Sequence, residues 1–136
     1  MQRDSSLRSL SSEHHTGLVI ARRAADAAYQ DEDTRAAAWS NIQEIFRTDL
    51  EPHFQREEQG LLSALREAGE VDLVERTLRE HRALRAMIAE ERVDNLALFA
   101  GALKAHIRFE ERQLFEAAQR LLGSERLAQM ELDESP

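Results

Sequence analysis

The sequence predicts an all-helical protein, folded as an up-down-up-down four-helix bundle with a short C-terminal helix. Ala, Leu, Glu and Arg, which favour helices, dominate the 136 residues, whereas β-branched residues are scarce. Only two prolines and five glycines interrupt the chain. Four long segments carry apolar residues at spacings of three and four, the pattern of a helix with one buried face.

The expected helix ends divide the chain into helices near residues 5–29, 34–67, 71–91 and 94–122. The breaks between them are predicted at QDED (30–33), AGE (68–70), ERVDN (91–95) and LLGS (121–124). Gly69 and Gly123 suit the position directly after the end of a helix, because glycine adopts a positive φ at little cost. A short amphipathic helix, SERLAQM, follows Gly123 and can be capped by Ser124. One domain is expected to span residues 1–136.

The first helix carries an apolar stripe that includes His14. The steps from His14 to Leu7, Leu10, Leu18 and Ala21 all reach apolar residues, whereas Arg22 and Asp26 lie seven and eleven residues beyond His15. His14 is therefore the predicted inward histidine. His15 remains an alternative, because it forms a second, shorter apolar face with Leu18 and Val19.

The second helix contains Pro52, which removes one backbone hydrogen bond and clashes with the preceding turn. We predict a kink just before His53 rather than a helix break, because the apolar spacing continues through this point from Phe46 to Leu61.

The second, third and fourth helices each place a histidine on their apolar stripe. The phrases HFQREE (53–58) and HIRFEE (106–111) are nearly the same, and each has a glutamate four residues after its histidine. This spacing puts imidazole and carboxylate one turn apart on the same face, so His53 pairs with Glu57 and His106 with Glu110. His81 is the inward histidine of the third helix.

These six residues are predicted to meet in one layer. In an up-down-up-down bundle they lie at similar depths, about 15–24 Å from one end at about 1.5 Å per residue. Burying so many polar groups without partners is costly. Histidine nitrogen and carboxylate oxygen are ligands for iron, manganese or zinc, and two carboxylates suit bridging a pair of ions. The sequence therefore predicts a dinuclear metal site built from His14, His53, Glu57, His81, His106 and Glu110.

Glu58 and Glu111 lie one residue farther round their helices. Three roles are open for them: exposed surface charges, hydrogen-bond partners of a ligand histidine, or additional metal ligands.

The bulk composition argues against several other classes of function. The formal net charge of −8 repels nucleic acid and anionic membranes. The absence of cysteine excludes disulfides, thiolate metal sites and cysteine nucleophiles. The longest apolar stretch, LALFAGAL (96–103), is too short for a membrane span or a signal peptide. We expect a cytoplasmic protein that binds neither nucleic acid nor membrane; its oligomeric state is not predicted.

The motifs EHH (13–15), PHFQREE (52–58), REH (79–81) and HIRFEERQLF (106–115) resemble those of the hemerythrin-like, or HHE cation-binding, domain. The resemblance spans nearly the whole chain. It implies a four-helix bundle with two non-haem iron ions joined by an oxo or hydroxo bridge. The family pattern falls on the same six residues.

The sequence departs from the oxygen-carrying hemerythrins in two ways. Those carriers have two histidines four residues apart on the third helix, whereas Thr77 and Arg85 flank His81 here. Water, His15, Glu58, Glu111 or a tyrosine could replace the missing ligand. The carriers also place the last carboxylate five residues after its histidine, which would favour Glu111 over Glu110 as a bridge.

The resemblance implies binding of dioxygen or a related small ligand, such as peroxide or nitric oxide, for sensing, storage or detoxification. An enzyme that turns over hydrogen peroxide or nitric oxide at the same centre is the first alternative, because a missing histidine leaves positions open to substrate. A structural metal-binding bundle is the second.

Overall fold

The computed structural model describes residues 3–134, and these residues form helices joined by short connections. The predicted domain limits at residues 1 and 136 lie outside them. The first helix comprises η1 (Ser5–Leu7) and α1 (Arg8–Ala27). The second runs without a break through α2 (Glu32–Ile45), η2 (Phe46–Leu50), α3 (Glu51–Arg56), η3 (Glu57–Leu61) and α4 (Leu62–Glu67). The third is α5 (Asp72–Ala89), and the fourth comprises α6 (Asn95–Phe109), η4 (Glu110–Leu114) and α7 (Phe115–Glu134).

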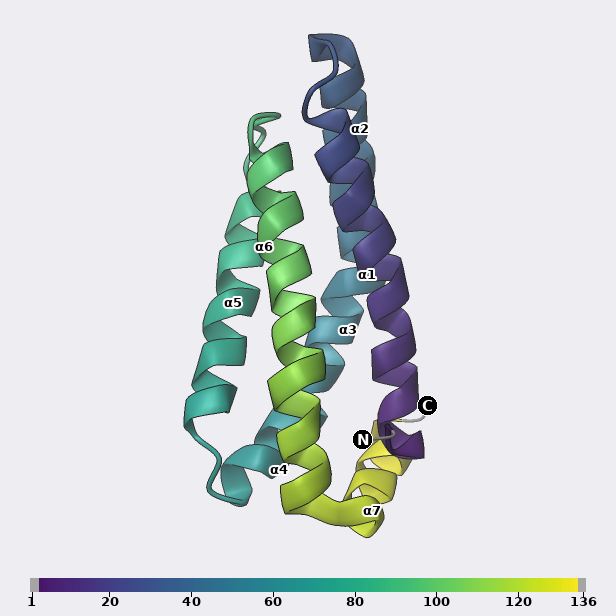
Figure 1. Ribbon diagram of the computed structural model, residues 1–136, viewed down its shortest axis with the longest axis vertical. Coiled ribbons are helices and arrows are strands. Elements are labelled where there is room, and N and C mark those ends of the chain that lie inside the picture. Colours follow the sequence, from purple (N-terminus) through teal and green to yellow (C-terminus); the bar gives the residue numbers. More distant parts are fainter. Residues whose placement is uncertain (1–2, 135–136) are drawn as a thin grey trace.

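The predicted bundle topology is confirmed. In Figure 1, α1 rises from the end where the N-terminus lies, α2 to α4 return, α5 rises again and α6 descends. The start of α7 continues α6, and its remainder turns across the lower end of the bundle beside the N-terminal segment (Figure 1). No helix among the described residues is long and apolar enough to cross a membrane.

Helix ends follow local chemistry. The side chain of Asp31 accepts a hydrogen bond from the backbone of Thr34 at 2.8 Å and caps the start of α2. Gly69, at φ 93°, ends α4, where the amide of Glu70 donates to the carbonyl of Leu65. Gly123, at φ 74° and ψ 168°, interrupts α7, so the C-terminal helix leaves in a new direction.

The helix continues across Pro52, as the apolar spacing predicts. Pro52 lies in the first turn of α3, directly after the π-helical turn η2. A π turn contains one more residue than an α turn, which adjusts the backbone where the proline cannot donate a hydrogen bond. Figure 1 shows the second helix changing direction between α2 and α4.

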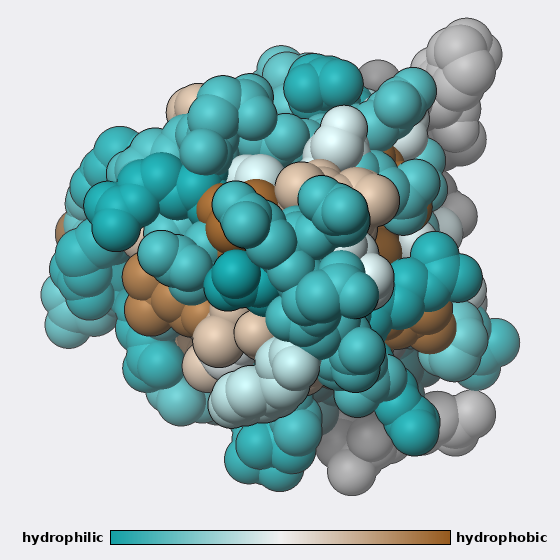
Figure 2. Space-filling model, turned by 90° about the horizontal axis from the view of Figure 1, so that it is seen from above, coloured by the Kyte–Doolittle hydropathy of each residue, from teal (hydrophilic) through white to brown (hydrophobic). Residues whose placement is uncertain are grey.

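Two apolar clusters fill the bundle, one above and one below the level of the buried histidines. The upper cluster includes Trp39, Phe46 and Phe99. The lower cluster includes Leu61 and Phe115 and extends to Leu127 and Met130 of the C-terminal helix. The C-terminal helix thereby completes the lower core. Seen from above, the surface of the molecule is mostly hydrophilic with scattered apolar side chains (Figure 2).

Candidate metal centre

All four helices contribute to a buried polar layer between the two apolar clusters. The side chains in this layer are between 0 and 5% exposed: His14 on α1, His53 on α3, Glu57 at the start of η3, His81 on α5, His106 on α6 and Glu110 at the start of η4. The structure therefore brings together the six residues expected from the sequence. That they bind metal stays a prediction.

The six residues form two overlapping groups that could each hold an ion. One group is His14, His53, Glu57 and Glu110, and the other is Glu57, His81, His106 and Glu110. Within each group, one nitrogen or oxygen per residue lies within 4.8 Å of the others. Both glutamates belong to both groups, so the arrangement is that of two neighbouring sites with two shared carboxylates.

Each glutamate directs one of its two carboxylate oxygens to the first group and the other oxygen to the second. Oε2 of Glu57 lies 3.3 Å from Nε2 of His53, and Oε1 lies 3.2 Å from Nε2 of His81. Oε1 of Glu110 lies 2.8 Å from Nε2 of His14, and Oε2 lies 3.2 Å from Nε2 of His106. Every carboxylate oxygen thus faces a different imidazole, as bridging between two ions requires.

Several of these buried atoms have no hydrogen-bond partner within the described part of the chain. They include both carboxylate oxygens of Glu57, Oε2 of Glu110 and Nε2 of His81 and His106. Leaving polar atoms buried and unsatisfied is costly, and a cation among them would satisfy them together. The donor set, nitrogen and oxygen without sulfur, fits iron, manganese or zinc.

In the metal-free site, protons on the buried histidines balance the negative charge of the buried carboxylates. Burial lowers the pKa of His81, but the nearby carboxylates of Glu110 and Glu57 outweigh this effect and raise the pKa to about 9. Burial likewise opposes protonation of His106, yet mainly the charge of Glu110 raises its pKa to about 10. For Glu110, burial raises the pKa, while the charge of His106 and the close imidazoles of His14 and His81 hold the pKa well below its usual range. Metal ions would replace these protons.

The outer nitrogen of each histidine faces a second carboxylate. Nδ1 of His14 lies 2.8 Å from Glu111, Nδ1 of His81 lies 2.7 Å from Glu58, and Nδ1 of His106 lies 2.7 Å from Glu80. Nδ1 of His53 lies 3.4 Å from Glu13. Glu58 and Glu111 therefore contact histidines from outside and belong to neither inner group.

The sequence interpretation missed Glu13 and Glu80. A signal for them exists: each outer glutamate is the sequence neighbour of an inner residue, as in Glu13–His14 and Glu80–His81. A neighbour lies about 100° round the helix, at the edge of the buried face. From there it reaches the histidine of an adjacent helix.

The remaining candidates lie elsewhere. His15 is exposed, in contrast to His14. Thr77 is buried, and its hydroxyl donates to the carbonyl of Leu73 at 2.7 Å. The guanidinium of Arg85 donates to Glu51 at 2.6 Å and to Glu58 at 2.8 Å. Neither position flanking His81 supplies a further nitrogen ligand.

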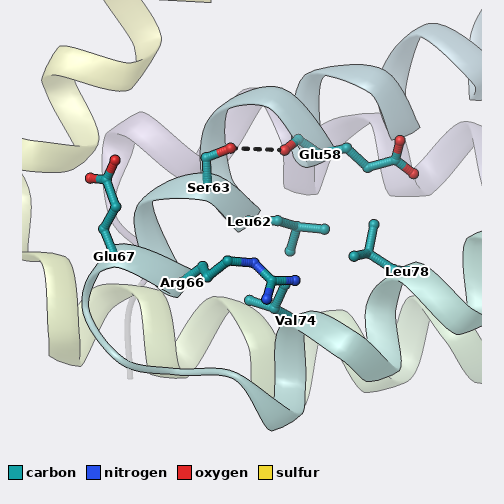
Figure 3. A pocket seen from close by; sticks show the side chains of 7 residues that line it. All are labelled: Glu58, Leu62, Ser63, Arg66, Glu67, Val74 and Leu78. Atoms are coloured by element: carbon teal, nitrogen blue, oxygen red, sulfur yellow. Dashed lines mark hydrogen bonds between the residues drawn. The ribbon is translucent and has the colours of Figure 1, made fainter.

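A cavity of about 320 Å³ touches this site only through Glu58 (Figure 3). Leu62, Val74 and Leu78 form the apolar part of its lining, and Glu58, Arg66 and Glu67 supply its charged groups (Figure 3). The six inner residues do not line this cavity.

Comparison with known families agrees with this geometry. Residues 5–118 match the family model of the hemerythrin HHE cation-binding domain, a span that includes all the inner and outer residues described above. No curated protein and no solved structure matches the chain. The match covers most of the sequence, and the chain belongs to the hemerythrin HHE cation-binding domain family.

Proposed function

We propose that this cation-binding protein is a non-haem di-iron protein that binds dioxygen or a related small ligand for sensing, storage or detoxification in the cytoplasm. The observation that carries the proposal is the pair of four-residue groups sharing Glu57 and Glu110. Shared carboxylates are a feature of dinuclear sites in helical bundles. The net charge of −8 supports a small ligand rather than nucleic acid or an anionic membrane as partner.

The two ions would be held by different histidines. His14 and His53 would hold one ion, and His81 and His106 would hold the other. Glu57 and Glu110 would each offer one carboxylate oxygen to the first ion and one to the second. When bound, the ions supply open positions for a small ligand and the capacity to exchange electrons with it. The chain's own residues exclude bulk water, because the site is buried between two apolar clusters.

Aromatic rings complete the enclosure. The ring of Phe54 stacks on His81 with centroids 3.9 Å apart, and Phe115 stacks on His14 at 5.3 Å. Each stacking contact holds its imidazole in a fixed plane and covers one face of that ring. The enclosure favours a ligand of a few atoms over a larger substrate.

Metal analysis tests the proposal directly. Protein produced with added iron is expected to contain two iron ions per chain, and the Glu57→Gln variant is expected to lose most of this iron while remaining helical by circular dichroism. Wild-type protein that contains less than about half an equivalent of iron would contradict a di-iron function.

The enzymatic alternative, turnover of hydrogen peroxide or nitric oxide, rests on a specific observation. The described residues offer two imidazoles to each ion position, and Thr77 and Arg85 add none. A reversible carrier needs one vacant position with the others occupied, whereas fewer protein ligands leave more positions for reactants. This coordination favours chemistry over reversible carriage.

Two measurements on one sample separate carriage from catalysis. The reduced, iron-loaded protein is mixed with oxygen and then placed under vacuum, and an oxygen electrode afterwards records its response to hydrogen peroxide. Catalysis converts two peroxide molecules into two waters and one dioxygen, so oxygen should evolve faster than with free iron or the iron-depleted His14→Ala variant. Full release of oxygen under vacuum without peroxide consumption would support a carrier or sensor. The absence of both responses would support a structural metal-binding bundle.

A further inference from the structure

The four outer carboxylates follow one order round the bundle. Glu13 of the first helix faces His53 of the second, and Glu58 of the second faces His81 of the third. Continuing this order, Glu80 of the third helix faces His106 of the fourth. Glu111 of the fourth faces His14 of the first, which closes the cycle. Each helix therefore supplies a carboxylate to a histidine of the next.

Each outer carboxylate also contacts an arginine. Arg76 donates to Glu80 at 2.9 Å, Arg85 to Glu58 at 2.8 Å and Arg3 to Glu111 at 2.8 Å. Arg56 contacts Glu13 in the same way. An arginine holds a carboxylate in a fixed plane through several donors, so the partner of each imidazole is itself oriented.

Three of the arginines also lie over a phenyl ring that borders the same histidine. Arg76 lies 4.0 Å from the ring centre of Phe109, and that ring lies 6.4 Å from His106. Arg85 lies over Phe54, which stacks on His81, and Arg3 lies over Phe115, which stacks on His14. The repeated combination of histidine, glutamate, arginine and phenylalanine distinguishes these contacts from isolated surface ion pairs, which are usually weak.

We propose that Glu58, Glu80 and Glu111, together with the more distant Glu13, are positioning residues that hold each imidazole with Nδ1–H outward and Nε2 directed at the ions. A histidine donates from one ring nitrogen when the other binds metal, so an acceptor at Nδ1 fixes both the tautomer and the ring plane. The inference deepens the proposed function and rests on it, because it assigns a role to residues around the same ions.

The four contacts are not equal, and this difference makes the inference specific. The contacts to His14, His81 and His106 are 2.7–2.8 Å long, whereas the His53–Glu13 contact is 3.4 Å. A hydrogen bond weakens as it lengthens in this range. Replacing Glu13 by glutamine should therefore have the smallest effect of the four.

The test uses zinc, which is diamagnetic and suits the same nitrogen and oxygen ligands. In zinc-loaded, ¹⁵N-labelled protein, the Nδ1–H signals of His14, His81 and His106 should be downfield and slow to exchange. Glu80→Gln keeps the shape of the side chain but removes its charge. It should shift the His106 signal, speed its exchange and lower zinc affinity about tenfold or more. The signals of His14 and His81 should stay in place.

Glu75→Gln is the matched control. Glu75 lies on the same helix as Glu80 and forms an exposed ion pair with Arg66 at 2.7 Å, away from the histidines. This variant should leave both the His106 signal and zinc affinity unchanged. Should Glu80→Gln fail to fold, Glu58→Gln provides the same test at His81.

The outcomes distinguish the two proposals. Wild-type protein that binds two zinc ions, with an unchanged His106 signal and affinity in Glu80→Gln, overturns the positioning role alone. Coordination of zinc through Nδ1 of His106 also overturns it. Wild-type protein that binds no metal ion overturns the proposed function and this inference with it.

Discussion

His14 and His15 are adjacent in sequence, yet their surroundings are opposite. His14 is 5% exposed, and both of its ring nitrogens contact glutamates at 2.8 Å. His15 lies on the exposed side of α1. The difference follows from the roughly 100° between neighbouring residues of a helix, which moves one ring into the core and the next into solvent.

Alanine at each position should separate the two histidines. We expect His14→Ala to lose most of the bound iron, because it removes one of two imidazoles from an ion position, and His15→Ala to retain it. Metal analysis of both variants, purified in parallel, checks this. Iron lost from His15→Ala but kept in His14→Ala would mean that the ring of His15 turns inward in the loaded protein.

The inner residues were identified from the sequence, whereas two of the outer ones, Glu13 and Glu80, were missed. The spacing of His53 and Glu57 within an apolar stripe identifies an inward face without knowledge of neighbouring helices. Glu80 is marked only as the sequence neighbour of His81, and which histidine it contacts depends on the rotation and separation of α5 and α6. A glutamate near arginines in a helical sequence resembles any exposed charge pair.

At the scale of helices, the main departure from regular geometry is a set of π turns. Two of them, η3 and η4, begin at Glu57 and Glu110, the two shared carboxylates. The helix limits and Gly69 were close to prediction because end signals are local in sequence. The π turns were not predicted, because they arise where side-chain packing on one face competes with the regular backbone, and no single residue type marks them.

Gly123 determines the direction of the C-terminal helix. Its combination of φ 74° and ψ 168° is nearly restricted to glycine. Gly123→Ala should lower the free energy of unfolding by about 1–3 kcal/mol, because the turn must strain or the C-terminal helix must leave the lower core. Urea unfolding measures the change.

Gly101→Ala is the control for this prediction. Gly101 lies within α6 with open space around the position of a Cβ atom. Alanine favours a helix over glycine by about 0.5–1 kcal/mol, so this variant should be neutral or more stable. Equal losses in both variants would show that the conformation of Gly123 is not what stabilises the C-terminal helix.

At the scale of the whole molecule, the buried charges link stability to pH. The folded, metal-free protein holds protons on His81, with a pKa of about 9, and on His106, with a pKa of about 10. The unfolded chain releases such protons near pH 6.5. Between these values the folded state binds more protons, so its stability falls as pH rises.

We therefore expect the melting temperature of chelator-treated protein to fall by several degrees between about pH 7 and pH 10, with the stabilisation fully present only below about pH 6.5. Iron-loaded protein should show a smaller fall, because the ions and not protons balance the carboxylates. Calorimetry across this pH range compares the two forms. A melting temperature that stayed constant or rose in the metal-free form would contradict these protonation states.

The π turns also bear on where the chain can change length during evolution. A π turn holds one residue more than an α turn, so deleting one residue from η3 or η4 can convert it to an α turn and leave the following helix in register. Leu65 and Ala118 would then keep their places in the lower core. A deletion in a regular part of the same helices would instead rotate the following segment by about 100°. Among natural variants, length changes within these helices should therefore concentrate at the π turns, beside those in the connections at residues 28–31, 68–71 and 90–94.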